Sequence, residues 1–249
     1  MTEIVAVISH KGGTGKTSLV QNLAHELART RRVLAVDLDP QSNLTIGSGF
    51  DLLTDRPTIL HAMHAPETTA ETIVQTASYS LLPANLDLAL ADQQFAGHYD
   101  RNDKLRDALA QVEDRFDLIL IDGPPNLGFF AFNALTAATQ VIVPLQCQPY
   151  AFRALDGTLQ LIDLVRKGNR GLRLQAVVLT MYDRRVTLTG SVESAARERF
   201  GNLVPQTVIP VNVSVAEATL DGVPVAVYAP QSTGAQAYSA LAKELFRGN

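Results

Sequence analysis

A glycine-rich segment near the start of the chain combines two lysines with adjacent hydroxyl groups, a set suited to binding phosphates. The segment reads Ser9, His10, Lys11, Gly12, Gly13, Thr14, Gly15, Lys16, Thr17, Ser18. Three glycines let the backbone curl so that its N–H groups face an anion, and a helix N-terminus adds partial positive charge. In such a loop Lys16 binds the β- and γ-phosphates and the Thr17 hydroxyl coordinates Mg²⁺. Residues 11–18 are therefore predicted to form a nucleotide site that binds ATP and Mg²⁺.

The residues on either side of this segment have the pattern that a phosphate loop needs. Residues 4–8 are a continuous apolar run, which is typical of a strand that is buried on both faces. After the loop, Leu19, Leu23 and Leu27 recur with helical spacing. The alternative is a glycine-rich turn with a chance G-K-T, and for His10 an ordinary packing or hydrogen-bonding role is favoured over catalysis.

Aspartates follow two other apolar runs of the chain. Residues 33–36 end in Asp37 and Asp39, and residues 116–121 end in Asp122. In an open parallel sheet ligands bind at the carboxyl ends of the strands, so these carboxylates should lie beside the phosphate loop. Asp122 is placed to hold Mg²⁺ through a water molecule.

The remaining patterns predict an α/β fold, a doubly wound and mostly parallel sheet with helices on both faces. Further strands are expected at 80–82, 141–145 and 174–181, and helices near 58–63, at 86–95, at 104–115 and up to residue 200. A last helix carries Tyr238, Leu241 and Leu245 on one face, which should dock on the sheet. Residues 48–103 are expected to be peripheral cover and a possible partner surface. We expect residues 1–249 to form a single domain.

Composition sets bounds on the function. The chain has 249 residues, of which 46% are hydrophobic and 18% charged, enough for a sizeable core. No secretory signal or run of about 18 apolar residues is present in the sequence, so we expect a cytoplasmic protein. The single cysteine, Cys147, excludes a disulfide framework and a thiolate-bound cluster such as that of the nitrogenase iron protein.

The charge is unevenly distributed along the chain. The formal net charge is −4. Residues 1–149 carry 10 Lys and Arg against 17 Asp and Glu, whereas residues 150–249 carry 11 against 8. A polyanion would therefore be expected on the second part of the chain.

Three motifs resemble those of a known family of ATPases. They are K-G-G-T-G-K-T-S, D-L-D-P-Q and D-G-P-P. The first lacks the first glycine of the usual phosphate-loop pattern and has the extra Lys11, as in the deviant Walker A box of the ParA/MinD class. From residue 4 to residue 246 the chain resembles the ParA/Soj partition ATPases, in their short form without an N-terminal helix-turn-helix domain. Asn126 stands where the family's switch II loop commonly has serine.

The resemblance implies roles for individual residues. Lys11 would reach across a homodimer interface to the phosphates of the other subunit, and Asp39 would orient the attacking water. Asp37 would support the Mg²⁺ waters or the loop. Pro210 and Asn212 match the I-P-x-N segment on the adenine side of the nucleotide, although an ordinary turn is the alternative.

A DNA-binding surface is also implied by the resemblance. Arg184 and Arg185 fall in a segment that the family uses to bind DNA, whereas Val211 and Ser214 stand where family members commonly have arginines. Other cations could add to the same field; they are Arg166, Lys167, Arg170 and Arg173. The alternative is a solvated basic surface without a partner.

The function implied is an ATP-driven dimerisation switch, catalytic through Lys11, Lys16 and Asp39. Its hydrolysis of ATP would be Mg²⁺-dependent and weak without a ParB-like partner. The dimer would bind DNA without sequence preference, so that the protein is nucleoid-associated and segregates a plasmid or chromosome.

Three alternatives stay open from the sequence. A MinD-like membrane positioner shares the loops, but the C-terminal segment has too little charge and apolar character for a membrane-targeting helix, so no stable membrane association is expected. A ligase similar to dethiobiotin synthase would give Lys11 no purpose. A positioning ATPase for a non-DNA cargo, such as a microcompartment or a chemotaxis cluster, cannot be separated by sequence from a DNA partitioner.

Overall fold

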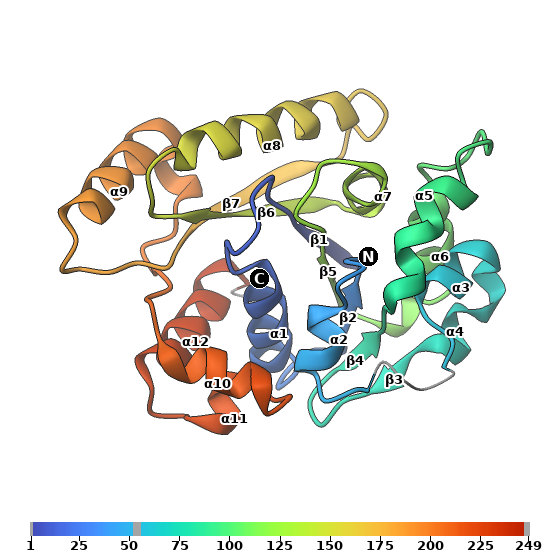
Figure 1. Cartoon of the computed structure of the whole chain (residues 1–249), viewed down its shortest axis with the longest axis horizontal. Coiled ribbons are helices and arrows are strands. Elements are labelled where there is room, and N and C mark those ends of the chain that lie inside the picture. The colour runs from blue at the N-terminus through green and yellow to red at the C-terminus, as the bar shows by residue number, and fades with distance from the viewer. Residues whose placement is uncertain (1, 52–55, 247–249) are drawn as a thin grey trace.

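The computed structural model describes residues 2–51 and 56–246, and these form a central sheet with helices on both faces (Figure 1). Seven strands of the described chain follow the order β3-β4-β2-β5-β1-β6-β7. Every pairing is parallel except that of β3 with β4. The strands are β1 (Glu3–Val7), β2 (Val33–Asp37), β3 (Val74–Gln75), β4 (Ser80–Leu82), β5 (Leu118–Asp122), β6 (Gln140–Gln146) and β7 (Arg173–Thr180).

The helices alternate with the strands along the chain, as a doubly wound fold requires. They are α1 (Lys16–Leu27), α2 (Asn43–Gly47), α3 (Ile59–His64), α4 (Thr69–Thr72), α5 (Ala91–Gln94), α6 (Lys104–Ala110), α7 (Phe129–Ala137), α8 (Ala151–Val165), α9 (Thr187–Phe200), α10 (Val213–Leu220), α11 (Val225–Tyr228) and α12 (Thr233–Leu245). Short 3₁₀ segments lie at Pro66–Thr68, Leu86–Leu90, Glu113–Arg115 and Gly201–Leu203.

Two apolar layers sandwich the sheet. Helices α1, α10, α11 and α12 bury their apolar side chains on one face, while α3, α6, α7, α8 and α9 cover the other. In Figure 1, α8 and α9 lie above β6 and β7, whereas α1, α10, α11 and α12 lie below them. The strand β5, whose residues are all buried, reads as the continuous apolar run that two covered faces demand. The predicted fold class is confirmed.

Two of the predicted helices are shorter than the sequence pattern indicated. The segment 86–95 is a 3₁₀ turn followed by the four-residue α5, with Leu86 and Leu90 exposed. The helix predicted at 104–115 ends at Ala110 and gives way to a 3₁₀ turn. In both places a short apolar stretch packs on the core without sustaining a 3.6-residue period.

The segment 48–103 does more than cover the sheet. Strand β4 pairs with β2 through Leu34, Ala35 and Val36, and β3 extends the sheet beyond it. The strand predicted at 80–82 is confirmed as β4, whereas β3 was not predicted, and these two strands belong to the sheet instead of covering it. Residues 52–55 of the segment lie outside the described residues.

The last helix docks as predicted. Tyr238 and Leu241 of α12 are buried in the same layer as α1, and Leu245 is partly buried against it. At the end of this helix the Arg31 guanidinium donates to Glu3 Oε2 at 3.0 Å and to the Phe246 carbonyl at 2.9 Å. One side chain thus ties the first strand to the end of the last helix.

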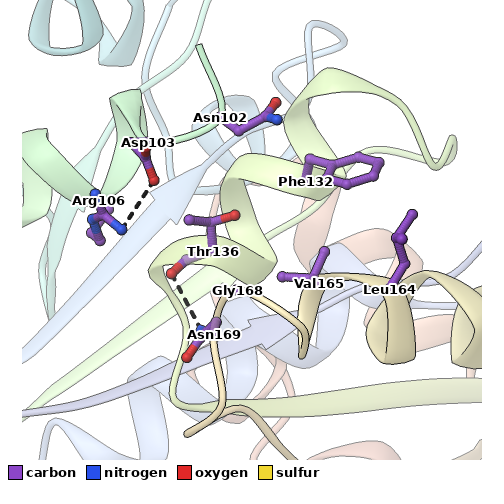
Figure 2. A pocket seen from close by; sticks show the side chains of 9 residues that line it. All are labelled: Asn102, Asp103, Arg106, Phe132, Thr136, Leu164, Val165, Gly168 and Asn169. Carbon is purple, nitrogen blue, oxygen red and sulfur yellow. Dashed lines mark hydrogen bonds and ion pairs between the residues drawn. The ribbon is translucent and has the colours of Figure 1, made fainter. Parts of the chain in front are cut away.

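A cavity of about 480 Å³ opens between α6, α7 and α8 (Figure 2). Phe132 and Thr136 of α7 face Leu164 and Val165 of α8 across it. At its edge the Asn169 amide donates to three carbonyls at the end of α7; these belong to Leu135, Thr136 and Ala138. The cavity lies at the C-terminal ends of α7 and α8, away from the phosphate loop.

Candidate functional site: a nucleotide-binding site

The phosphate loop connects β1 to the N-terminus of α1. Gly13 and Gly15 have φ angles of 70° and 83°, in the left-handed region that glycine adopts without strain. The loop is fixed to the sheet because the Thr180 hydroxyl at the end of β7 donates to the Thr14 carbonyl at 2.9 Å. The result is a curled backbone at a helix N-terminus, which is an anion-binding geometry.

Lys16 is buried at the base of this loop among carboxylates. Its side chain is 6% exposed, and burial lowers its pKa, while the charges of Asp122 and Asp39 act in the opposite direction. Next to it, the Thr17 hydroxyl donates to Asp122 Oδ2 at 2.7 Å. The structure therefore brings Lys16, Thr17, Asp39 and Asp122 together, as the strand-end argument predicted.

The two aspartates after β2 have different surroundings. Asp37 is fully buried and accepts three hydrogen bonds, from the Thr45 backbone N–H at 2.9 Å, the Thr45 hydroxyl at 2.7 Å and the Asp39 N–H at 3.2 Å. Among the described residues, the Asp39 carboxylate accepts a hydrogen bond only from the Gln41 N–H, at 3.0 Å. Asp37 is thus occupied in holding the loop that presents Asp39.

The residues present fit a magnesium ion. Asp122 is fully buried, and its Oδ1 has no hydrogen-bond partner among the described residues. A buried carboxylate oxygen without a partner is costly unless a cation or water satisfies it. Burial, followed by the charge of Asp37, raises the pKa of Asp122 well above its ordinary value. The oxygen donors of Thr17 and Asp122 are of the kind that Mg²⁺ prefers.

A second cavity, of about 370 Å³, adjoins the phosphate loop. Its lining includes Gly15, Ser18, Pro210, Asn212 and Tyr238, so the structure brings the predicted base-contacting residues to the loop. The Asn212 amide donates to Thr233 Oγ1 at 2.9 Å, while its buried Oδ1 has no partner in the described chain. An acceptor of this kind matches the exocyclic amine of adenine.

Lys11 lies apart from the buried carboxylates. Its ammonium donates to Gln148 Oε1 at 3.0 Å, in the connection between β6 and α8. Lys11 is half-buried and Gln148 is exposed, so this cation is at the surface of the site.

The predicted DNA-binding arginines lie on a neighbouring hollow. Arg184 and Arg185 line a cavity of about 600 Å³ together with Pro210, Val211 and Val213. Both arginines are exposed, as is Val211 at 57% and Val213 at 71%. Val211, at a family arginine position, thus replaces charge with apolar surface on this face.

The other predicted cations do not join this field. Lys167, Arg170 and Arg173 lie at or before the start of β7, whereas Arg184 and Arg185 follow its end. Eight residues of strand separate them by roughly 23 Å, well beyond a Debye length of about 8 Å at physiological salt. Arg166 is paired with Asp163 at 3.0 Å. The suggestion that these four cations could add to the field of Arg184 and Arg185 was wrong.

Three residues of the site were missed from the sequence. Tyr238 was assigned to packing, yet it is hydrogen-bonded to Ser18 and lines the base cavity. Thr180 fixes the phosphate loop, and Gln148 holds Lys11. Thr180 ends a predicted strand at the carboxyl edge, which could have identified it; a lone glutamine in a connection gives no such signal.

Several known proteins match this chain over most of its length. A family model described as an AAA domain matches residues 2–174. The chain is 42% identical to the chromosome-partitioning ATPase Soj of Thermus thermophilus, over 97% of this chain and 94% of the relative.

The chain belongs to the ParA/Soj family of partition ATPases. Its fold matches a cobyrinic acid a,c-diamide synthase from Mycobacterium smegmatis with bound ATP analogue and magnesium (35% identity, TM-score 0.89, 99% and 95% of the two chains). It also matches the septum site-determining protein MinD from Pyrococcus horikoshii with Mg-ADP (30% identity, TM-score 0.82, 99% and 97%). ATP and Mg²⁺ are the cofactors of this ParA/Soj chain, and its general activity is that of the family's ATPases.

Among residues 2–51 and 56–246, no helix combines the length and the apolar character needed to cross a bilayer.

Proposed function

We propose that the protein is an ATP-dependent dimerisation switch that binds DNA without sequence preference and segregates a plasmid or chromosome with a ParB-like partner. The observation that carries this proposal is the separation of the two lysines. Lys16 is buried among carboxylates, whereas Lys11 is held at the surface by a neutral amide. A surface cation beside a nucleotide site is placed to act on a second subunit.

Within one subunit, the phosphates bind to the loop N–H groups and to the ammonium of Lys16. Thr17 and Asp122, the latter through water, would hold Mg²⁺, and the ion would supply positive charge to offset the charge that develops on the phosphates. Asp39 accepts a hydrogen bond from the attacking water and orients it. Few groups here would activate that water strongly, so hydrolysis is slow without a partner protein.

Between subunits, each Lys11 contacts the phosphates bound by the other. Dimerisation is thereby coupled to the γ-phosphate, and hydrolysis removes the link. Asn212 and Pro210, which line the cavity beside the phosphate loop, contact the adenine base.

DNA binds to the face that carries Arg184 and Arg185. Non-specific affinity comes mainly from the release of counterions, so few cations give weak and salt-sensitive binding. In the cell this attraction would make a cytoplasmic protein nucleoid-associated.

We infer a single domain for residues 1–249.

A second candidate function rests on the same face. The exposed Val211 and Val213 would favour a protein cargo over a phosphate backbone. A positioning ATPase for a non-DNA cargo would keep the nucleotide switch and lose the affinity for DNA.

Two measurements test the proposal. Lys16→Ala should abolish nucleotide binding, because the backbone alone leaves the phosphate charge uncompensated, and hydrolysis at the parental rate in this variant would refute the site. Adding a chelator of Mg²⁺ should stop hydrolysis by the unmodified protein.

The DNA function is tested by a salt titration of DNA binding with ATP, with ADP and without nucleotide. Binding should require ATP, vanish at modest salt and be lost when Arg184 and Arg185 are both changed to Glu, with ATP binding unchanged. If no state binds DNA at low salt, the cargo alternative replaces the DNA proposal.

A further inference from the structure

His10 and Lys11, at the start of the phosphate loop, both contact one segment of the chain. This segment consists of the β6–α8 connection and the first half of α8. The Lys11 ammonium donates to Gln148 Oε1, and the His10 N–H donates to Thr158 Oγ1 at 3.1 Å. Thr158 is fully buried and its hydroxyl donates in turn to the Ala154 carbonyl at 3.1 Å. The start of the loop is thus fixed at two points, one in the β6–α8 connection and one on α8.

We propose that Gln148 is a positioning residue that holds Lys11 within its own subunit and so opposes ATP-dependent dimerisation. This inference rests on the proposed function, in which Lys11 must reach the phosphates of a second subunit. The Lys11–Gln148 hydrogen bond is then a contact of the monomer, and it is given up each time the dimer closes.

The backbone around Gln148 is shaped to keep its side chain in place. Its N–H donates to the Gln146 carbonyl at 2.8 Å, and its own carbonyl accepts from the Ala151 N–H at 3.2 Å. Between them Tyr150 has a φ of 63°, which is uncommon for a residue other than glycine. Such conformations persist only where the surrounding structure determines them.

The His10 side chain packs against α8, so a movement of the phosphate loop at this residue would be transmitted to α8. A Cβ atom on Gly157 would lie 2.9 Å from His10 Nδ1, so the ring rests directly on the backbone of α8 at this glycine. His10 therefore cannot move toward α8 without displacing this helix. Because Thr158 holds the backbone of His10 independently, loss of the Gln148 contact should release the Lys11 side chain without displacing the loop.

The chemistry of Gln148 sets the size of the effect. A glutamine oxygen is neutral, and this contact is solvent-exposed, so it holds Lys11 only modestly; a carboxylate at the same place would bond the ammonium about twice as strongly. Closing the symmetric dimer releases two lysines. A change of about threefold per subunit therefore becomes about ninefold in the dimer dissociation constant.

The experiment compares Gln148→Glu, Gln148→Met and the parent by sedimentation with ATP and Mg²⁺ over a range of protein concentrations. Gln148→Glu should raise the dimer dissociation constant about tenfold or more, and Gln148→Met, which removes the acceptor at similar volume, should lower it about tenfold. Gln111→Glu, at an exposed glutamine that directly follows α6, is the matched charge control and should leave the dimer dissociation constant unchanged. Binding of a fluorescent ATP analogue, measured at protein concentrations at which the monomer prevails, should be the same in all four proteins, because Gln148 contacts Lys11 and not the residues that hold the phosphates of its own subunit.

The outcomes separate this inference from the proposed function. If the parent does not dimerise with ATP, the proposed function fails. If the parent dimerises and the Gln148 variants match it, or if Gln148→Met dimerises more weakly, Gln148 does not restrain Lys11. A second check is independent of assembly: in the monomer with ADP, Gln148→Met should increase the reactivity of the Lys11 amine toward an acylating reagent about threefold, and an unchanged rate would overturn the inference.

Discussion

Asp183 binds the guanidinium of Arg185 through two hydrogen bonds, from Nε to Oδ1 at 2.9 Å and from Nη2 to Oδ2 at 2.7 Å. This bond lowers the pKa of Asp183 to about 2, so the pair stays ionised at every working pH. One of the two proposed DNA-binding arginines therefore carries its own counterion. For Arg184 no hydrogen bond or ion pair is found within residues 2–51 and 56–246.

Asp183→Asn should strengthen DNA binding. The change removes the negative charge beside Arg185, whose cation then becomes available to a phosphate, so log affinity against log salt should steepen by about one. A fluorescence anisotropy titration at several salt concentrations measures both effects. The amide oxygen introduced by this substitution can still accept the hydrogen bond that the Arg185 backbone N–H donates to Asp183 Oδ1 at 3.0 Å.

A matched control exists at the other end of β7. Asp163 pairs with Arg166 at 3.0 Å, on the side of the sheet away from Arg185. Asp163→Asn makes the same change in net charge and should leave the salt slope unaltered. Equal effects of the two substitutions would mean that DNA responds to net charge alone and would reject the assigned face.

Asp39→Ala and Lys11→Ala should separate hydrolysis from dimerisation. Asp39→Ala should bind ATP, accumulate as a dimer and hydrolyse at least about tenfold more slowly, since positioned acid–base groups contribute about 10²–10⁴-fold. Lys11→Ala should bind ATP and stay monomeric. Sedimentation with ATP decides the matter, and a monomeric Asp39→Ala with a dimeric Lys11→Ala would reverse the roles.

Asp37→Ala should destabilise the fold by about 3 kcal/mol, because three donors inside the protein lose their acceptor. Thr45→Val keeps the backbone bond and should cost about 1–2 kcal/mol. Denaturant unfolding without nucleotide measures both values. An Asp37→Ala protein as stable as its parent would show that this carboxylate does not hold the loop.

The same carboxylate should make stability depend on pH. Burial raises the pKa of Asp37 from 3.8 to about 6, so the folded protein takes up this proton more readily than the unfolded chain. The free energy of unfolding should therefore fall as the pH rises from about 4 to about 6. Asp37→Asn should reduce this slope, and a parent that gains stability over that interval relative to the variant would contradict the assignment.

The centre of the site follows from sequence because short-range rules determine it. A buried strand that ends in glycines, and two apolar runs that end in Asp37 and Asp122, must bring their ends to one edge of a parallel sheet. In the structure Asp37 and Asp122 are direct neighbours on β2 and β5. No long-range information was needed beyond the direction of the strands.

The electrostatics of the periphery could not be predicted in this way. Whether Arg185 is neutralised by Asp183 depends on the turn after β7, and whether Lys167 adds to Arg184 depends on the ends of that strand. The helix predicted at 86–95 begins instead as a 3₁₀ turn, from which Leu88 packs into the core. The spacing of apolar residues does not distinguish such a turn from a short α-helix.

The bridge that Arg31 makes between Glu3 and Phe246 brings distant parts of the chain together at the amino edge of the sheet, while the nucleotide loop lies at its carboxyl edge. A fluorescent protein fused at either side of this bridge would be remote from the phosphates and from Gln148. The same proximity makes this fold a candidate for circular permutation: a short flexible linker could connect Phe246 to Glu3, and the chain could be opened in a surface connection. Such a permutant would carry reporters beside Lys11 and turn dimer closure into an optical signal.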